Sequence, residues 1–99
     1  MPQRMQGWPS GAGTNSTIAA TTAGVAGGDT PALGVIFHLP AAAGGGVTIT
    51  MAAAGSNAGG IGLAVGETTQ ILPCPGGNLN GWKAWSAAST ITLNATVLT

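Results

Sequence analysis

Apolar and polar residues alternate along most of the chain from residue 18 onward. The clearest stretch is the last one, residues 91–97, where Ile, Leu, Ala and Val take turns with Thr and Asn. Shorter alternating stretches cover residues 33–37, 47–51 and 61–65, and two more candidate strands lie at 69–72 and 82–87. A period of two with many β-branched residues is typical of strands that bury one face. The pattern therefore predicts strands and no long helix.

Turn signals divide these stretches at short intervals. They are clusters of Gly, Pro, Asn and Asp at residues 27–29, 44–46, 59–60 and 75–78. Two runs of three alanines, at 41–43 and 52–54, are each closed by glycine and are too short to nucleate a helix. Short strands at regular spacing with such turns predict an all-β fold. We expect a small single-domain β-sandwich or barrel of about six to seven short antiparallel strands over residues 18–99.

The first seventeen residues carry no periodic pattern and are expected to form an extended N-terminal arm. Proline and glycine punctuate this segment, which also holds Met5 and Trp8. A disordered terminus is one interpretation. Disordered tails are poor in aromatic residues, however, so an arm that docks Trp8 onto a neighbouring subunit is the alternative. Met5 and Trp8 are therefore candidate interface residues.

Charge is almost absent from the chain. Only Arg4, Asp29, Glu67 and Lys83 are charged, which is 4% of the residues, whereas about a quarter is usual for a soluble domain. A surface of this kind is poorly protected against association. We therefore expect a subunit whose surface lies largely against neighbours, and whose stability depends partly on those contacts.

The charge balance also excludes several classes of partner. The net charge is zero, so the basic surface that binds nucleic acid or anionic membranes is missing. No stretch of about eighteen apolar residues is present to span a membrane. Arg4 is followed by polar residues and not by the apolar core of a signal peptide, so we expect none.

The side chains that could perform chemistry are few. His38 is the only histidine, and the two carboxylates, Asp29 and Glu67, both stand in expected turns. Cys74 is the only cysteine and lies between two prolines, which favours a small, half-buried apolar role. This inventory is too small for a catalytic site, a metal site or a cofactor site. We expect a protein that is not an enzyme.

Two tryptophans flank a lysine near the C-terminal end. Trp82 and Trp85 are three apart, so on a strand they face opposite sides. One should enter the core and the other should point outward, either covering an edge or anchoring an interface, where tryptophan is enriched. An outward tryptophan could also stack a sugar. Both residues are therefore candidate interface residues.

The chain resembles the small, charge-poor virion proteins of tailed bacteriophages, and among them the capsid decoration (cement) proteins. The resemblance lies in the arm with Trp8, the stretch 47–51, the Ile71-Leu72-Pro73 exit and the terminal stretch 91–97. Such proteins are commonly β-rich, often trimeric, and bind the outer capsid lattice. The resemblance implies a homo-oligomer made in the host cytoplasm that binds a major capsid protein or another virion protein on the virion surface.

Two other functions stay open from the sequence. A neck, tail or fibre subunit of a virion would share the same composition. A carbohydrate-binding β-module would use Trp82 or Trp85 to stack a sugar ring.

Overall fold

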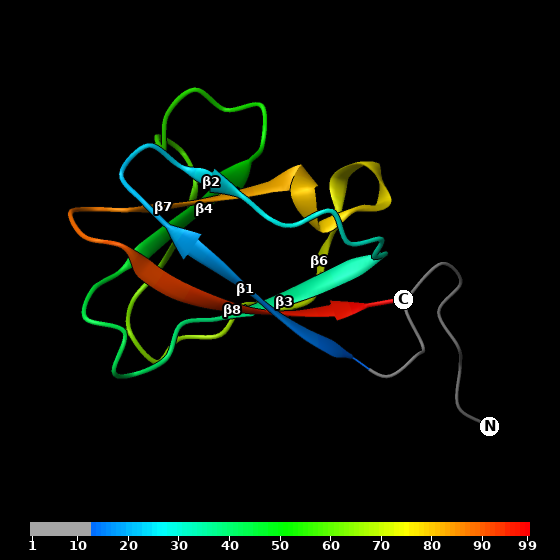
Figure 1. The fold of residues 1–99 in the computed structure, drawn as a ribbon, viewed down its shortest axis with the longest axis horizontal. Coiled ribbons are helices and arrows are strands. Elements are labelled where there is room, and N and C mark those ends of the chain that lie inside the picture. Colours follow the sequence, from blue (N-terminus) through cyan, green and yellow to red (C-terminus); the bar gives the residue numbers. More distant parts are fainter. Residues whose placement is uncertain (1–12) are drawn as a thin grey trace.

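A computed structural model describes residues 13–99, which form eight strands and two short 3₁₀ turns (Figure 1). The chain is all-β over this range and every strand pair is antiparallel, as expected, but it has eight strands where about six to seven were expected. Within residues 13–99 no helix is long and apolar enough to cross a membrane. The elements are β1 (Thr14–Ala20), β2 (Val25–Ala26), β3 (Gly34–His38), β4 (Val47–Met51), β5 (Ile61–Leu63), β6 (Leu72–Pro73), the turns η1 (Pro75–Gly77) and η2 (Leu79–Gly81), β7 (Trp82–Ser86) and β8 (Ile91–Leu98).

The strands form two four-stranded sheets that make a sandwich. The order in the first sheet is β1-β8-β3-β6, and in the second it is β2-β7-β4-β5. Strands pair from the ends of the chain inward: first with last, second with seventh, third with sixth and fourth with fifth. This is the pairing of one long hairpin rolled up on itself, which is the eight-stranded jelly-roll topology.

The core lies between the two sheets and follows the alternation of the sequence. In β8, each of Ile91, Leu93, Ala95 and Val97 is buried, while the residues between them lie on the outer side. This strand is central, because it pairs with β1 on one side and with β3 on the other. Aromatic packing joins the sheets, since the rings of Phe37 and Trp82 meet edge to face with centroids 6.3 Å apart.

The expected boundary of the N-terminal arm at residue 17 is wrong. Thr14 already pairs with Val97, and the pairing continues residue by residue to Ala20 opposite Ile91. Thr14–Thr17 thus belong to a strand, because their backbone completes the ladder on the free side of β8. Residues 1–12, with Met5 and Trp8, lie outside the described residues.

Several strands are shorter than the alternation implies. Leu33 and Val65 are exposed although they continue the apolar pattern, because β3 begins at Gly34 and β5 ends at Leu63. Ile61 is exposed within β5, which is an edge strand. The stretch expected at 69–72 becomes the two-residue strand β6, which includes Pro73. Proline is tolerated there because β6 is an edge strand, where no further strand needs its missing N–H.

Candidate functional site

The two carboxylates of the described chain hold turns together. The side chain of Glu67 accepts a hydrogen bond from the backbone N–H of Ala64 at 2.6 Å, which closes the turn after β5. Asp29 accepts a hydrogen bond from the side-chain amide of Asn78 at 2.9 Å. The oxygen of that same amide accepts from the backbone N–H of Thr30 at 3.1 Å. Asp29 therefore helps to tie the loop after β2 to the segment before β7.

Lys83 lies on the outer face of the second sheet and connects a loop to a ring. Its Nζ donates to the carbonyl oxygen of Ala54 at 3.2 Å, in the loop between β4 and β5. The same nitrogen is 5.2 Å from the centroid of the Trp85 ring, within the range of a cation–π contact. Lys83 thus fastens the loop over its own strand.

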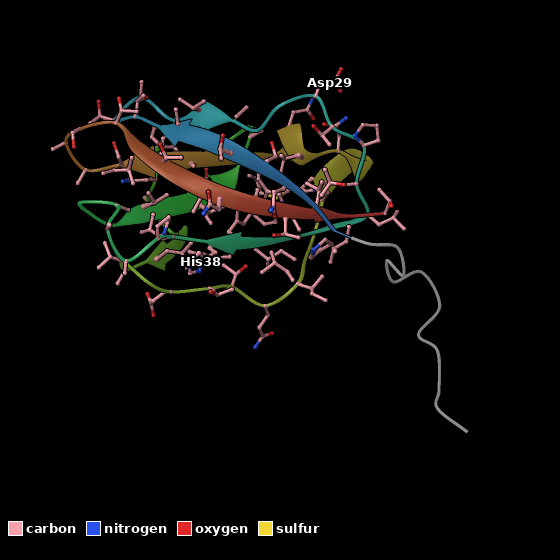
Figure 2. The ribbon with its side chains drawn as sticks, turned by 60° about the horizontal axis from the view of Figure 1, so that its bottom comes forward. Asp29 and His38 are labelled. Atoms are coloured by element: carbon pink, nitrogen blue, oxygen red, sulfur yellow. The ribbon has the colours of Figure 1, made fainter. Side chains whose placement is uncertain are left out.

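All three charged side chains within residues 13–99 therefore contact neutral groups of their own chain. Their partners are backbone amides and carbonyls, one side-chain amide and one aromatic ring. Asp29 and His38 lie on different parts of the sandwich, Asp29 in the loop after β2 and His38 at the end of β3 (Figure 2). The rest of the described surface carries hydroxyls, amides, glycine and small apolar side chains, together with five exposed large apolar side chains: Leu33, Met51, Ile61, Val65 and Ile71.

Trp82 is a core residue and is not available to a partner. Its side chain is 8% exposed and packs against Phe37. Its Nε1 donates to the carbonyl oxygen of Pro73 at 3.0 Å, so the polar end of the ring is satisfied internally. The expectation that one of the two tryptophans enters the core is confirmed for Trp82.

Trp85 faces the outside of the second sheet, yet its own chain covers it. It is also 8% exposed. Its Nε1 donates to Thr50 Oγ1 at 2.9 Å, and Lys83 lies over the ring. The turn after β1 closes on the ring as well, because a Cβ added at Gly24 would lie 2.8 Å from it. The expectation that one tryptophan points outward is therefore confirmed for Trp85, whereas its ring is not exposed to a partner or a sugar in this structure.

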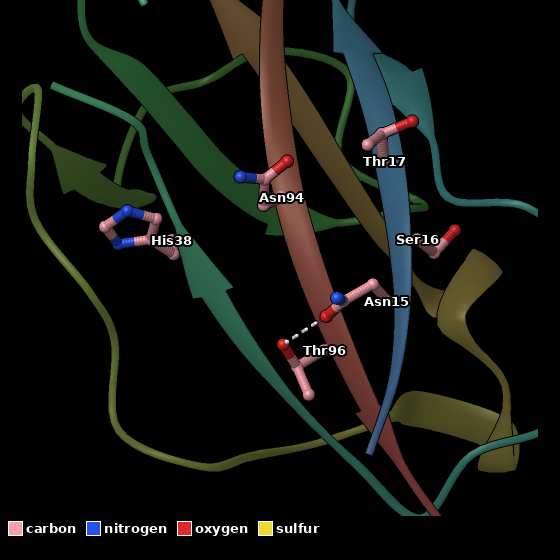
Figure 3. Close-up of a pocket in the computed structure, with 6 residues that line it drawn as sticks. All are labelled: Asn15, Ser16, Thr17, His38, Asn94 and Thr96. Carbon is pink, nitrogen blue, oxygen red and sulfur yellow. Dashed lines mark hydrogen bonds between the residues drawn. The ribbon is translucent and has the colours of Figure 1, made fainter. Parts of the chain in front are cut away.

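A groove without charged residues crosses the outer face of the first sheet (Figure 3). It has a volume of about 590 Å³ and is lined by Asn15, Ser16, Thr17, His38, Asn94 and Thr96. Asn94 stands opposite Thr17 on one side and His38 on the other, so the three form one row across β1, β8 and β3. Thr96 donates to Asn15 Oδ1 at 3.2 Å in the next row. We call this lining the polar face. It can donate and accept hydrogen bonds.

Sequence patterns did not indicate the polar face, because its residues come from three strands that are distant in the chain. His38 is held there by Thr68, whose Oγ1 is 2.7 Å from His38 Nδ1. The donor in this contact depends on the histidine tautomer. The one sequence feature that points to this face is the row of Thr and Asn on one side of residues 91–97.

Cys74 is buried, in agreement with the role expected for it. The side chain belongs to the core, and burial raises the pKa of its thiol. A protonated, buried thiol is a poor nucleophile. Within residues 13–99, no three His, Cys, Asp or Glu side chains come together as metal ligands.

No family model, curated protein or solved structure matches the chain. The jelly-roll topology and the chemistry of the described surface are thus the observations from which a function can be inferred.

Proposed function

We propose that the chain is a structural virion protein that decorates and stabilises a phage capsid. In this role it binds copies of itself and a major capsid protein or another virion protein. It needs no cofactor and performs no catalysis. The first twelve residues, with Met5 and Trp8, would supply contacts to the capsid or to a sister subunit.

The neutral surface of the sandwich is the observation that carries this proposal. Residues 13–99 carry only three charged side chains, Asp29, Glu67 and Lys83, so little charge is present to keep free monomers apart. Removing a charged group from water is costly, whereas hydroxyls and amides can be covered at a much lower cost when the covering protein supplies hydrogen bonds to them. A surface of this composition suits permanent burial against other protein.

The topology agrees with a role in a virion. Jelly rolls occur in viral capsid domains, although the same topology also serves lectins and cupins. A shared fold is an analogy and does not decide function. The lectin alternative loses its main support here, because the ring of Trp85 lies under Lys83 and beside the turn at Gly24. A neck, tail or fibre subunit remains the competing virion role.

Labelling of intact particles tests the proposal. Particles would be purified on a density gradient from a lysate of the strain that encodes the chain, and labelled with a gold-conjugated antibody raised against it. A matched stock in which the gene carries an early stop codon is the control. We expect the chain to sediment with the particles and the label to lie on the capsid shell.

The same two stocks test stabilisation. Particles without the chain should release their DNA at a lower temperature than normal particles, and purified chain added back should restore the difference. Label confined to the neck, tail or fibres would favour the competing virion role. A chain found only in the unsedimented fraction would refute both.

A further inference from the structure

The four edges of the sandwich differ strongly in length. The first sheet ends in β1 and β6, and the second ends in β2 and β5. Three of these edge strands have only two or three residues, whereas β1 has seven. Short edge strands are one of the devices by which proteins prevent edge-to-edge pairing. Only one edge of the described sandwich is therefore long enough to template another strand.

β1 also lacks several other devices that protect an edge. Its sequence, Thr-Asn-Ser-Thr-Ile-Ala-Ala, contains no charge, no proline and no glycine, and its pairing with β8 runs without a bulge. Among residues 13–99, no backbone hydrogen bond from another segment reaches Thr14–Ala20 on the side away from β8. The backbone groups on that side are open to an added strand, which could pair with them.

We propose that β1 pairs with β1 of a second copy of this chain, antiparallel and around a two-fold axis. No other edge strand of the described sandwich is long enough to match it, so pairing through these edges has to join like to like. The product is a dimer in which the two first sheets form one continuous sheet of eight strands.

The side chains of β1 fit this self-pairing. With the axis at the middle of the strand, Thr17 stands opposite Thr17 of the second copy, and Asn15 stands opposite Ala19. On the inner side, Ser16 stands opposite Ile18. Threonine pairs and small side chains are favourable neighbours across strands, and no like charges meet. The polar face would continue from one copy to the next.

This inference rests on the proposed function only in that both require copies to associate. It specifies a two-fold contact, whereas the decoration proteins that the chain resembles are often trimeric. A chain that is monomeric in solution but present on capsids would refute the β1 pairing and leave the proposed function standing. A dimer absent from particles would do the reverse.

Charge placed at the centre of β1 tests the pairing in the full-length chain. The variants are Thr17→Lys and Thr17→Glu, because Thr17 is exposed and faces away from the core. Thr92→Lys is the matched control: it adds the same charge on the outer face of the same sheet, but on β8, one strand away from the edge. Near-ultraviolet circular dichroism of the tryptophans would verify that each variant is folded.

Sedimentation velocity over a concentration series gives the result. We expect the wild-type chain and Thr92→Lys to reach twice the 9.4 kDa of one chain. For each Thr17 variant alone, the dissociation constant of the dimer should rise about tenfold at low salt, because like charges then stand opposite each other. An equimolar mixture of the two variants should recover the dimer, since opposite charges then meet. A monomeric wild-type chain, or Thr17 variants that dimerise as well as the wild type, would overturn the proposal.

Discussion

Replacing Lys83 by methionine should destabilise the sandwich by loosening the loop between β4 and β5. Methionine keeps most of the apolar stem over Trp85 and removes the charged nitrogen. Two contacts are lost: the hydrogen bond to the carbonyl oxygen of Ala54 at 3.2 Å and the cation–π contact at 5.2 Å.

The size of the effect follows from these contacts. The hydrogen bond is rather long and the lysine is half-buried, so it should contribute about 1 kcal/mol, below the usual range for charged donors. A partly exposed cation–π contact adds about 0.5–1 kcal/mol. We expect the free energy of unfolding to fall by about 1–2 kcal/mol. In a domain of this size, that lowers Tm by about 5–15 °C.

Urea unfolding followed by tryptophan fluorescence measures the change. Lys83→Arg is the matched control, because it keeps the charge, the stem and a group that can lie over the ring. It should lose less than half as much stability. Hydrogen exchange should also accelerate in residues 52–60 of the methionine variant. An unchanged free energy of unfolding in Lys83→Met, with unchanged exchange in that loop, would refute the role assigned to this lysine.

Two further predictions concern the core. Leu93→Ala should lower the free energy of unfolding by about 2–5 kcal/mol in urea titrations, because Leu93 is fully buried in the central strand. Leu33→Ala should change it by less than about 0.5 kcal/mol, because the side chain of Leu33 is 54% exposed. Burial raises the pKa of the Cys74 thiol in the folded chain. The stability that the protonated thiol contributes is therefore fully present below the thiol pKa of the unfolded chain, and it is lost as the pH rises through the folded pKa. The wild-type chain should therefore lose stability more steeply than Cys74→Ala above about pH 8.5, and equal slopes for the two chains would contradict this.

The strands that the sequence predicts best are those whose two faces differ most. Residues 91–97 alternate without exception, and the structure buries every apolar position among them. Residues 14–17 read as an arm because they hold no large apolar side chain. Their strand is stabilised by pairing with β8, which is eighty residues away in the chain. Local patterns cannot show such a partner, and for the same reason they cannot give the order of the strands in the two sheets.

The candidate site shows a similar limit. The alternation correctly placed Trp82 and Trp85 on opposite faces of a strand. It did not show that the outward ring would be covered, because the cover comes from Gly24 in a distant turn and from the stem of Lys83. The engagement of Asp29, Glu67 and Lys83 with their own chain is also a tertiary property. The sequence shows that charge is scarce, and only the contacts show how the remaining charges are used.

Electron cryomicroscopy of native particles from the strain that encodes the chain tests the central claim most directly. The account predicts many copies of this jelly roll on the outer capsid surface, with its neutral faces covered by the shell or by further copies of the chain. A well-resolved capsid without density for this fold, with the chain detected in the same lysate as a free monomer, would contradict it.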